Sequence, residues 1–185
     1  RYRSGGTGSD IRISLRQQDR SIAFSLRGRY RNEPFRLEGS AAPLRQLFAA
    51  GRYPFDLEFT ALATHGRIQG SLRRPLRLDG LRASLTVEGP NPRRAEPVLG
   101  FRLPELPPYR LAGPLLRQDG VWTFGPFRGS VGNTDLSGRI VAQFNRGRPD
   151  VTARLHSRLL DLDDLGGVIG GAPGAAPGEV GAGGQ

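Results

Sequence analysis

Side chains able to act as an acid, a base or a nucleophile are scarce in this sequence. The two histidines, His65 and His156, belong to no recognisable pattern of nucleophile and base, although histidine is the side chain most often used in general acid–base catalysis. The chain contains no cysteine, which excludes thiol catalysis, disulfides and zinc ribbons. We therefore expect a protein that is not an enzyme, with His65 in a turn and His156 on the polar face of a strand.

Two further motifs are similar to ligand sites but lack residues that such sites require. Gly5-Gly6-Thr7-Gly8 is similar to a phosphate-binding loop, but a P-loop needs a lysine, and all 27 basic residues of this chain are arginine. Asp161, Asp163 and Asp164 offer the oxygen ligands that calcium prefers, but no EF-hand glycine pattern surrounds them. Their spacing favours a turn or cap after the last strand, and we expect neither a metal nor another cofactor.

The largest chemical feature is a set of arginines that alternate with apolar residues. The net charge of +10 attracts polyanions, including phospholipid headgroups, lipid A phosphates and nucleic acid; a simply solvated outer face is the alternative. The arginines of this face are Arg12, Arg16, Arg27, Arg29, Arg36, Arg67, Arg73, Arg82, Arg139, Arg154 and Arg158. Single-strand nucleic-acid binders place aromatic platforms on the same surface as their basic residues. Here the aromatic residues Phe24, Phe35, Phe55, Phe59 and Phe144 fall on the opposite phase, so nucleic acid is not expected as a partner.

Short segments with a two-residue period position these side chains. In the segment 21–27, for example, Ile22, Phe24 and Leu26 alternate with small or charged residues, and such alternation places successive side chains on opposite faces of a sheet. The sequence predicts strands over about 10–17, 21–31, 34–40, 54–63, 66–73, 81–88, 109–117, 120–124, 134–144 and 148–159. Hairpin turns are predicted at Asn32-Glu33-Pro34, His65-Gly66, Asp79-Gly80, Asp119-Gly120 and Asn145-Arg146-Gly147.

These patterns predict an all-β fold, a curved antiparallel sheet built as a meander of hairpins. About nine strands give an apolar face on the order of 1,000 Å², whereas soluble monomers rarely expose more than a few hundred Å² of contiguous apolar surface. Two arrangements would cover this face. The sheet folds onto itself as a closed β-sandwich, or it curls into a groove that takes up acyl chains.

The sequence divides into three parts. Residues 1–9 predict a linker, 10–165 a β-sheet domain, and 166–185 a disordered tail of mostly Gly, Ala and Pro, which cannot bury enough apolar surface to order itself. Within the domain, 42–50 predict one or two helical turns and 89–108 an irregular, proline-rich connection. No apolar run is long enough to span a membrane, and the chain does not begin with methionine. We expect a fragment or a processed product, with any membrane anchor outside these residues.

A block of three motifs in the C-terminal part of the domain carries a family resemblance. Residues 108–113 read Pro-Tyr-Arg-Leu-Ala-Gly, 129–138 read Gly-Ser-Val-Gly-Asn-Thr-Asp-Leu-Ser-Gly, and 157–165 read Ser-Arg-Leu-Leu-Asp-Leu-Asp-Asp-Leu. In this order they resemble the AsmA family of bacterial envelope proteins. The resemblance implies a long curved β-sheet groove with an apolar interior, a location in the bacterial periplasm with an inner-membrane anchor, and a part in phospholipid transport toward the outer membrane.

The apolar phase and the resemblance lead to one functional hypothesis, a non-enzymatic module for lipid handling or outer-membrane assembly. In this hypothesis, acyl chains of phospholipid or lipid A contact Ile22, Phe24, Leu26, Phe55, Leu57, Phe59, Leu85, Leu111, Ile140 and Leu155. The alternative is a closed β-sandwich that serves as a structural or glycan-binding module of the envelope.

Overall fold

The computed structural model describes residues 11–18, 20–30, 33–96, 103, 105–145, 148–159 and 161. The predicted linker at 1–9 and the predicted tail at 166–185 lie outside these residues, as do Asp163 and Asp164. The described part of the chain is all-β, as the sequence predicts, and its helical segments are three short 3-10 helices.

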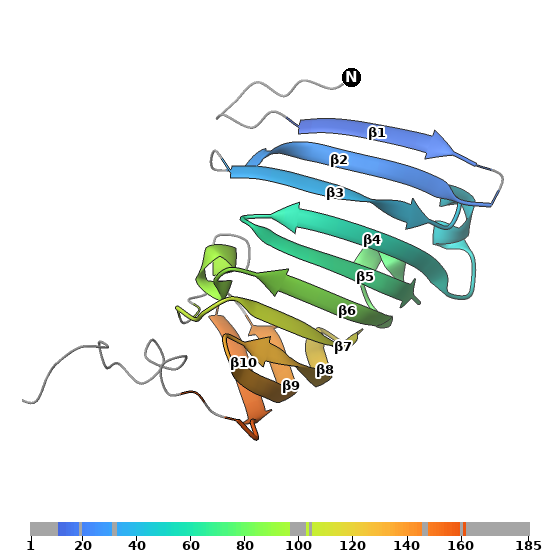
Figure 1. Cartoon of the computed structure of the whole chain (residues 1–185). Helices are drawn as coiled ribbons and strands as arrows, with labels where there is room; N and C mark the ends of the chain where they lie inside the picture. Colours follow the sequence, from blue (N-terminus) through green and yellow to red (C-terminus); the bar gives the residue numbers. More distant parts are fainter. Residues whose placement is uncertain are drawn as a thin grey trace, which may run out of the picture.

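Ten antiparallel strands follow one another in the sheet in the order of the sequence. The strands are β1 (Ile11–Gln17), β2 (Ile22–Tyr30), β3 (Glu33–Ala41), β4 (Tyr53–Ala61), β5 (Thr64–Leu72), β6 (Leu81–Gly89), β7 (Tyr109–Gln118), β8 (Val121–Val131), β9 (Thr134–Asn145) and β10 (Arg148–His156). The 3-10 helices η1 (Leu44–Phe48), η2 (Pro75–Arg77) and η3 (Pro92–Ala95) lie in connections between strands. Figure 1 shows a continuous sheet that twists along its length and curls at the end formed by β8, β9 and β10.

Neighbouring strands pair so that apolar positions lie beside apolar positions or glycines. One row of directly paired residues runs through Ile13, Leu26, Leu37, Phe59, Gly66, Val87, Leu111, Gly129 and Leu136. A second row runs through Leu15, Phe24, Gly39, Leu57, Ile68, Leu85 and Gly113. Because a slip of one residue would turn the apolar set of a strand to the other face, this register gives the whole sheet one apolar and one polar face.

A β-bulge in β8 preserves the apolar face where the sequence pattern breaks. The sequence predicts a strand that ends at residue 124, because Gly125 and Pro126 interrupt the alternation. The strand instead runs on, with these two residues opposite a single residue of β9. Gly125 has a φ of 131°, which residues with a side chain rarely adopt. The extra residue brings Phe124 and Phe127 to the same face, although they are three positions apart.

The hairpin between β4 and β5 turns earlier than the sequence indicates. The sequence predicts a turn at His65-Gly66, but Leu62 and Ala63 form the turn, with φ values of 54° and 60°. Positive φ at both central residues is typical of a type I′ turn, which Asn-Gly or Asp-Gly usually supplies. The prediction is therefore wrong because no such pair marks the turn, and His65 lies in β5 on the polar face.

No second layer covers the sheet within the described ranges of the chain. Each strand pairs only with its neighbours in sequence, and β1 and β10 form two open edges. A closed β-sandwich would require two sheets to pack face to face at about 10 Å, so the sandwich alternative is wrong. The groove-like alternative, a single curved and open sheet, is the one that forms (Figure 1).

Burial is highest at the two ends of the strands and at Phe127 within β8, which is 1% exposed. The rim where β1, β3, β5 and β7 end holds the buried residues Ile22, Ala42, Pro43, Tyr53 and Leu81. The opposite rim holds the buried residues Thr64, Tyr109, Val131 and Thr134. We name the first the η1–η2 rim, formed by residues 42–52 and 73–80, and the second the η3 rim, formed by residues 90–96 and 105–108. Between the rims, most side chains of the apolar face are only half-buried.

Glycines on the apolar face allow neighbouring strands to approach closely. A Cβ atom added to Gly129 would overlap the carbonyl oxygen of Arg110 and lie 2.9 Å from the Cα atom of Leu111 on β7. A Cβ atom added to Gly66 would overlap the ring of Phe59, so the ring lies directly over this glycine. Glycine is the residue that permits such contact between backbones or between a ring and a backbone.

We predict that Gly129→Ala destabilises the sheet. The added methyl group has no room beside Arg110, and over-packing of this kind costs about 1–3 kcal/mol. Urea unfolding followed by far-UV circular dichroism measures the loss. Ser130→Ala, one position along the same strand, is the matched control and should change the free energy of unfolding by about 0.5 kcal/mol or less. Equal stability of the Gly129 variant and wild type would contradict the close approach of the two strands.

Candidate functional site

The structure places all ten predicted lipid-contacting residues on the apolar face. Leu26, Phe59 and Leu111 lie in the first paired row, and Phe24, Leu57 and Leu85 in the second. Ile22, Phe55 and Ile140 lie in a third row, which continues through Ala41, Gly70, Ala83, Leu115 and Phe124. Leu155 pairs with Gly138, which in turn pairs with Phe127. The candidate site is therefore one continuous surface that extends over most of the sheet.

This surface is least covered at its outer strands. Leu15 on β1 and Leu155 on β10 are 66% and 50% exposed, whereas Leu57 and Leu85 at the centre are half-buried. The strongest local packing is at the bulge, where the rings of Phe124 and Phe127 stack with centroids 5.0 Å apart. An apolar surface that is exposed at its outer strands and only half-buried at its centre can contact flexible hydrocarbon chains without rearranging the backbone.

At the η1–η2 rim, side chains of the apolar face hold the adjoining connections in place. The hydroxyl group of Tyr53 donates to the carbonyl oxygen of Ala42 at 2.5 Å, at the base of η1. The guanidinium group of Arg117 donates to the carbonyl oxygens of Arg77 and Leu78, both at 2.7 Å. Both connections therefore border the apolar face at this end of the strands.

Arg117 is a residue that the sequence pattern did not identify as part of this face. It pairs with Leu81 on one side and Trp122 on the other, so it occupies an apolar phase. Its guanidinium carbon lies 5.2 Å from the centroid of the Trp122 ring, a cation–π arrangement that suits an arginine at the edge of an apolar surface. The only signal in the sequence is that Arg117 follows Leu111 and Leu115 in the same two-residue period.

At the η3 rim, a buried polar contact closes the other end of the apolar face. The hydroxyl groups of Thr64 and Tyr109 lie 3.3 Å apart, and both residues are buried. Gly89 lies beside them, since a Cβ atom added to it would be 3.1 Å from the Tyr109 ring. The predicted irregular connection at 89–108 thus begins with a tightly packed residue, and η3 follows it.

The polar face brings the predicted arginines together with carboxylates. Arg36 and Arg27 donate to Glu38 at 2.7 Å and 2.8 Å, and Ser25 donates to the same carboxylate at 3.0 Å. These hydrogen bonds, with Arg36 contributing most, lower the pKa of Glu38 to about 2. Arg67 forms a bidentate ion pair with Asp56, with Nε 2.9 Å from Oδ1 and Nη2 2.6 Å from Oδ2. This pair lowers the pKa of the Asp56 carboxyl group.

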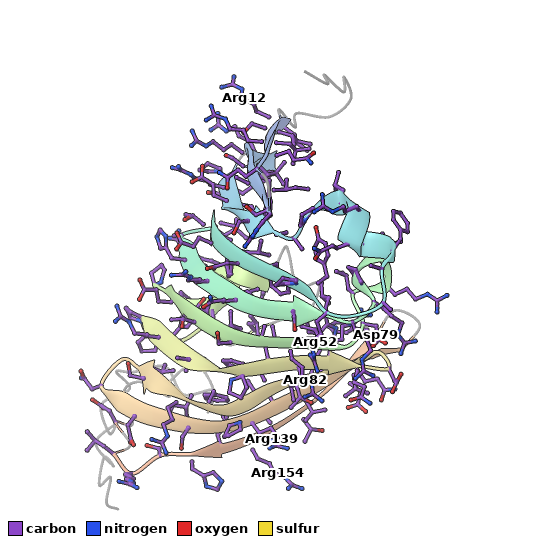
Figure 2. All side chains as sticks on the ribbon, turned by 90° about the vertical axis from the view of Figure 1, so that its right-hand side faces the viewer. Arg12, Arg52, Asp79, Arg82, Arg139 and Arg154 are labelled. Atoms are coloured by element: carbon purple, nitrogen blue, oxygen red, sulfur yellow. The ribbon has the colours of Figure 1, made fainter. Side chains whose placement is uncertain are left out.

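Other arginines of this face have room for solvent. A hollow of about 380 Å³ lies on the polar side of β1, β2 and β3, lined by Arg12, Ser14, Arg16, Ala23, Phe24, Ser25, Arg27 and Glu38. Figure 2 shows how far the arginines spread, from Arg12 at the β1 end of the sheet to Arg139 and Arg154 at the other end. The polar face is therefore a mosaic of ion pairs and solvated arginines rather than a single binding pocket.

We predict that the Glu38 carboxyl group titrates at a pH of about 2 in the folded protein. Its pKa is depressed from 4.5, so its stabilising contribution is present above the unfolded value and is lost as the pH falls from there to about 2. NMR titration of the Glu38 side-chain carbon measures this pKa. Arg36→Gln should raise the pKa, whereas Arg82→Gln, elsewhere on the polar face, should leave it unchanged. A wild-type midpoint near 4.5 would contradict the triple hydrogen bond.

Two parts of the motif block that carries the family resemblance are hydrogen-bonded to each other: the start of β9 and the segment that follows β10. The carboxylate of Asp135 accepts hydrogen bonds from the backbone N–H groups of Leu159 and Arg158, at 2.7 Å and 2.9 Å, and from the hydroxyl group of Ser157 at 3.0 Å. These bonds lower the pKa of Asp135. The Thr-Asp pair at the start of β9 thus holds the Ser-Arg-Leu segment, and the backbone N–H of Asp161 donates to Thr134 at 3.0 Å.

We predict that Asp135→Ala releases this segment. Loss of a capping acceptor costs about 1 kcal/mol, so the amides of Arg158 and Leu159 should exchange with solvent about fivefold faster. Hydrogen exchange followed by NMR measures both amides. Asp135→Asn keeps an acceptor oxygen and should show a smaller effect, and Asp150→Ala, on the exposed surface of β10, should show none. Unchanged exchange in Asp135→Ala would mean that other contacts hold the segment.

The remaining candidate sites of the sequence do not come together. The Nδ1 atom of His65 lies 3.1 Å from the hydroxyl oxygen of Thr60. His156 is an exposed residue at the end of β10. Within the described ranges, no three His, Asp or Glu side chains converge as metal ligands would, and Gly5-Gly6-Thr7-Gly8 lies outside them. The expectations that the protein is not an enzyme and uses no cofactor stay predictions.

The fold and the site together define a single-layered β-meander that leaves one apolar face open. The chain is 27% identical over 158 residues to the AsmA family protein YhjG of Escherichia coli (strain K12). The match covers 82% of this chain but 23% of YhjG, so the chain spans less than a quarter of the length of this relative. This similarity supports membership of the AsmA family, as the motifs at 108–165 indicate.

Two other comparisons found no match. No protein-family model matches the sequence, and no solved structure matches the chain. In the described residues, no helix is both long enough and apolar enough to cross a membrane.

Proposed function

We propose that this chain is a non-enzymatic lipid-handling module of the bacterial envelope, with acyl chains bound along its apolar face. The observation that carries the proposal is an apolar surface that runs across ten strands and has no covering layer in the described part of the chain. A soluble protein rarely leaves so large a surface bare. Hydrocarbon chains suit it because each buried CH₂ group contributes about 0.8 kcal/mol.

Two features favour a lipid over a protein as the occupant. The glycines and rings of the face produce a smooth apolar strip with few polar groups to specify a protein partner. The arginines of the opposite face and of the rims carry a positive charge, which attracts the phosphate groups of phospholipid or lipid A.

The similarity to an AsmA family protein supports an envelope setting. Periplasmic location, an anchor elsewhere in a longer parent protein, and a part in outer-membrane assembly belong to the same proposal.

We predict that the purified chain retains phospholipid or lipid A. Organic extraction followed by mass spectrometry should recover lipid from the wild type, and Phe59→Gln should lower the amount about fivefold or more, because the amide group replaces a large apolar contact. Phe59 is half-buried on β4, so the variant should remain folded.

Glu58→Gln is the matched control for this experiment. Glu58 adjoins Phe59 on the same strand, points to the polar face and is exposed, and it receives the same replacement residue. Lipid recovery should equal that of the wild type. Absence of lipid from the wild type, or equal loss in both variants, would defeat the proposal.

A further inference from the structure

The η1–η2 rim projects several large apolar side chains into solvent. Phe48 is 80% exposed and Leu76 is 69% exposed, and Leu44 and Leu78 are both more than half exposed. These four residues do not belong to the sheet, since they lie on η1, on η2 and directly after η2. Figure 1 shows η1 at the right-hand end of the strands, and the turned view of Figure 2 shows it standing out from the sheet.

The base of the η1 segment is firmly held while its tip is exposed. Ala42 and Pro43, which precede η1, are buried, as is Tyr53, which follows the segment. The backbone N–H of Ala42 donates to the carbonyl oxygen of Pro54 at 3.0 Å. The exposure of Phe48 therefore arises from a structured projection of the chain.

The η2 segment has the same construction. Arg74 forms an ion pair with Asp79 at 2.8 Å, and the backbone groups of these two residues are also hydrogen-bonded. Asp79 further accepts a hydrogen bond from the backbone N–H of Asp119 at 2.9 Å, while Arg117 holds the carbonyl oxygen of Leu78. Leu78 has a φ of 51°, a strained conformation for a leucine that surrounding contacts must maintain. Strain that keeps an apolar side chain in solvent points to a use for that side chain.

The two projections lie side by side and carry a strong positive charge. Tyr53, after η1, pairs with Leu72, before η2, and Arg52 donates to Ser71 across the same gap at 3.3 Å. In Figure 2, which faces this rim, Arg52 and Asp79 both lie along it. Residues 42–52 and 73–80 contain five arginines and one acidic residue, Asp79.

Most of this charge is available to a ligand. Of the ion pairs in the described part of the chain, none involves Arg45, Arg73 or Arg77. Exposed apolar tips set among arginines match the two layers of a membrane interface, acyl chains below and anionic headgroups above.

We propose that the η1–η2 rim docks on the surface of an anionic phospholipid bilayer. Leu44, Phe48, Leu76 and Leu78 enter the boundary between headgroups and acyl chains, and the arginines bind the phosphate groups. This docking does not require lipid on the apolar face, so it stands or falls independently of the proposed function.

Vesicle binding tests the docking. The purified 185-residue chain is sedimented at low ionic strength with vesicles of phosphatidylcholine alone or of phosphatidylcholine mixed with phosphatidylglycerol. Binding to the anionic vesicles should be about tenfold tighter or more. Leu76→Ser and Phe48→Ser should each weaken that binding about tenfold, and Arg45→Gln combined with Arg77→Gln should weaken it by a similar factor at low salt.

Leu159→Ser is the matched control, because Leu159 is an equally exposed leucine at the opposite rim, and its vesicle binding should equal that of the wild type. Arg12→Gln combined with Arg16→Gln controls for general charge and should have a much smaller effect than the rim pair. Failure of the wild type to bind anionic vesicles, or equal losses in Leu76→Ser and Leu159→Ser, would overturn the docking. Lipid extraction from Leu76→Ser and Phe48→Ser separates the two proposals, since neither residue belongs to the apolar face and both variants should retain as much lipid as the wild type.

Discussion

The structure depends on a single constraint, the constant two-residue phase of side chains across ten strands. Every hairpin must return the chain with its apolar residues on the same face, and the register of all nine strand pairs does so. The bulge at Gly125 and Pro126 is needed to keep this phase. Without the extra residue, the second half of β8 would turn its apolar side chains to the polar face. The open face is therefore a property of the whole sheet and of no single motif.

A single layer has to obtain its stability without a core between two sheets. This sheet does so at three places: at the rims, where Tyr53 and Tyr109 are buried; on the apolar face, where rings lie over glycines; and on the polar face, where Glu38 and Asp56 pair with arginines. The middle of the apolar face contributes less, because most of its side chains are only half-buried, with the buried Phe127 as the exception. That division leaves the middle free to exchange one apolar contact for another while the rims maintain the fold.

The alternation in the sequence predicts all ten strands, because period-two patterning reports directly on the two faces of a sheet. The turn at Asp119-Gly120 is also predictable and is confirmed, with φ values of 50° and 82°. The turn predicted at His65-Gly66 is wrong because Gly66 lies within β5, beneath the ring of Phe59. A glycine required for packing cannot be distinguished in the sequence from a glycine required for a turn. The openness of the apolar face also could not be predicted, because a closed sandwich and an open sheet have the same alternation of apolar and polar residues. Only the order of strand pairing distinguishes the two arrangements. The exposed tips on η1 and η2 follow no period at all, so three-dimensional burial was needed to find them.

The two proposals meet at the η1–η2 rim, where Arg117 lies near the end of β7. This residue sits on the apolar phase between Leu81 and Trp122, and its guanidinium group also fastens η2 to the sheet. Under the two proposals, a phospholipid that leaves a bilayer at the η1–η2 rim would have its acyl chains next to the apolar rows and its phosphate next to arginines. The adjacent position of rim and face thus allows the headgroup to remain at a charged, solvated end while hydrocarbon enters along the strands. An arrangement with the apolar projections at the centre of the sheet would lack this property, because the charged headgroup would then have to cross the apolar surface, at the high cost of moving a charge away from water.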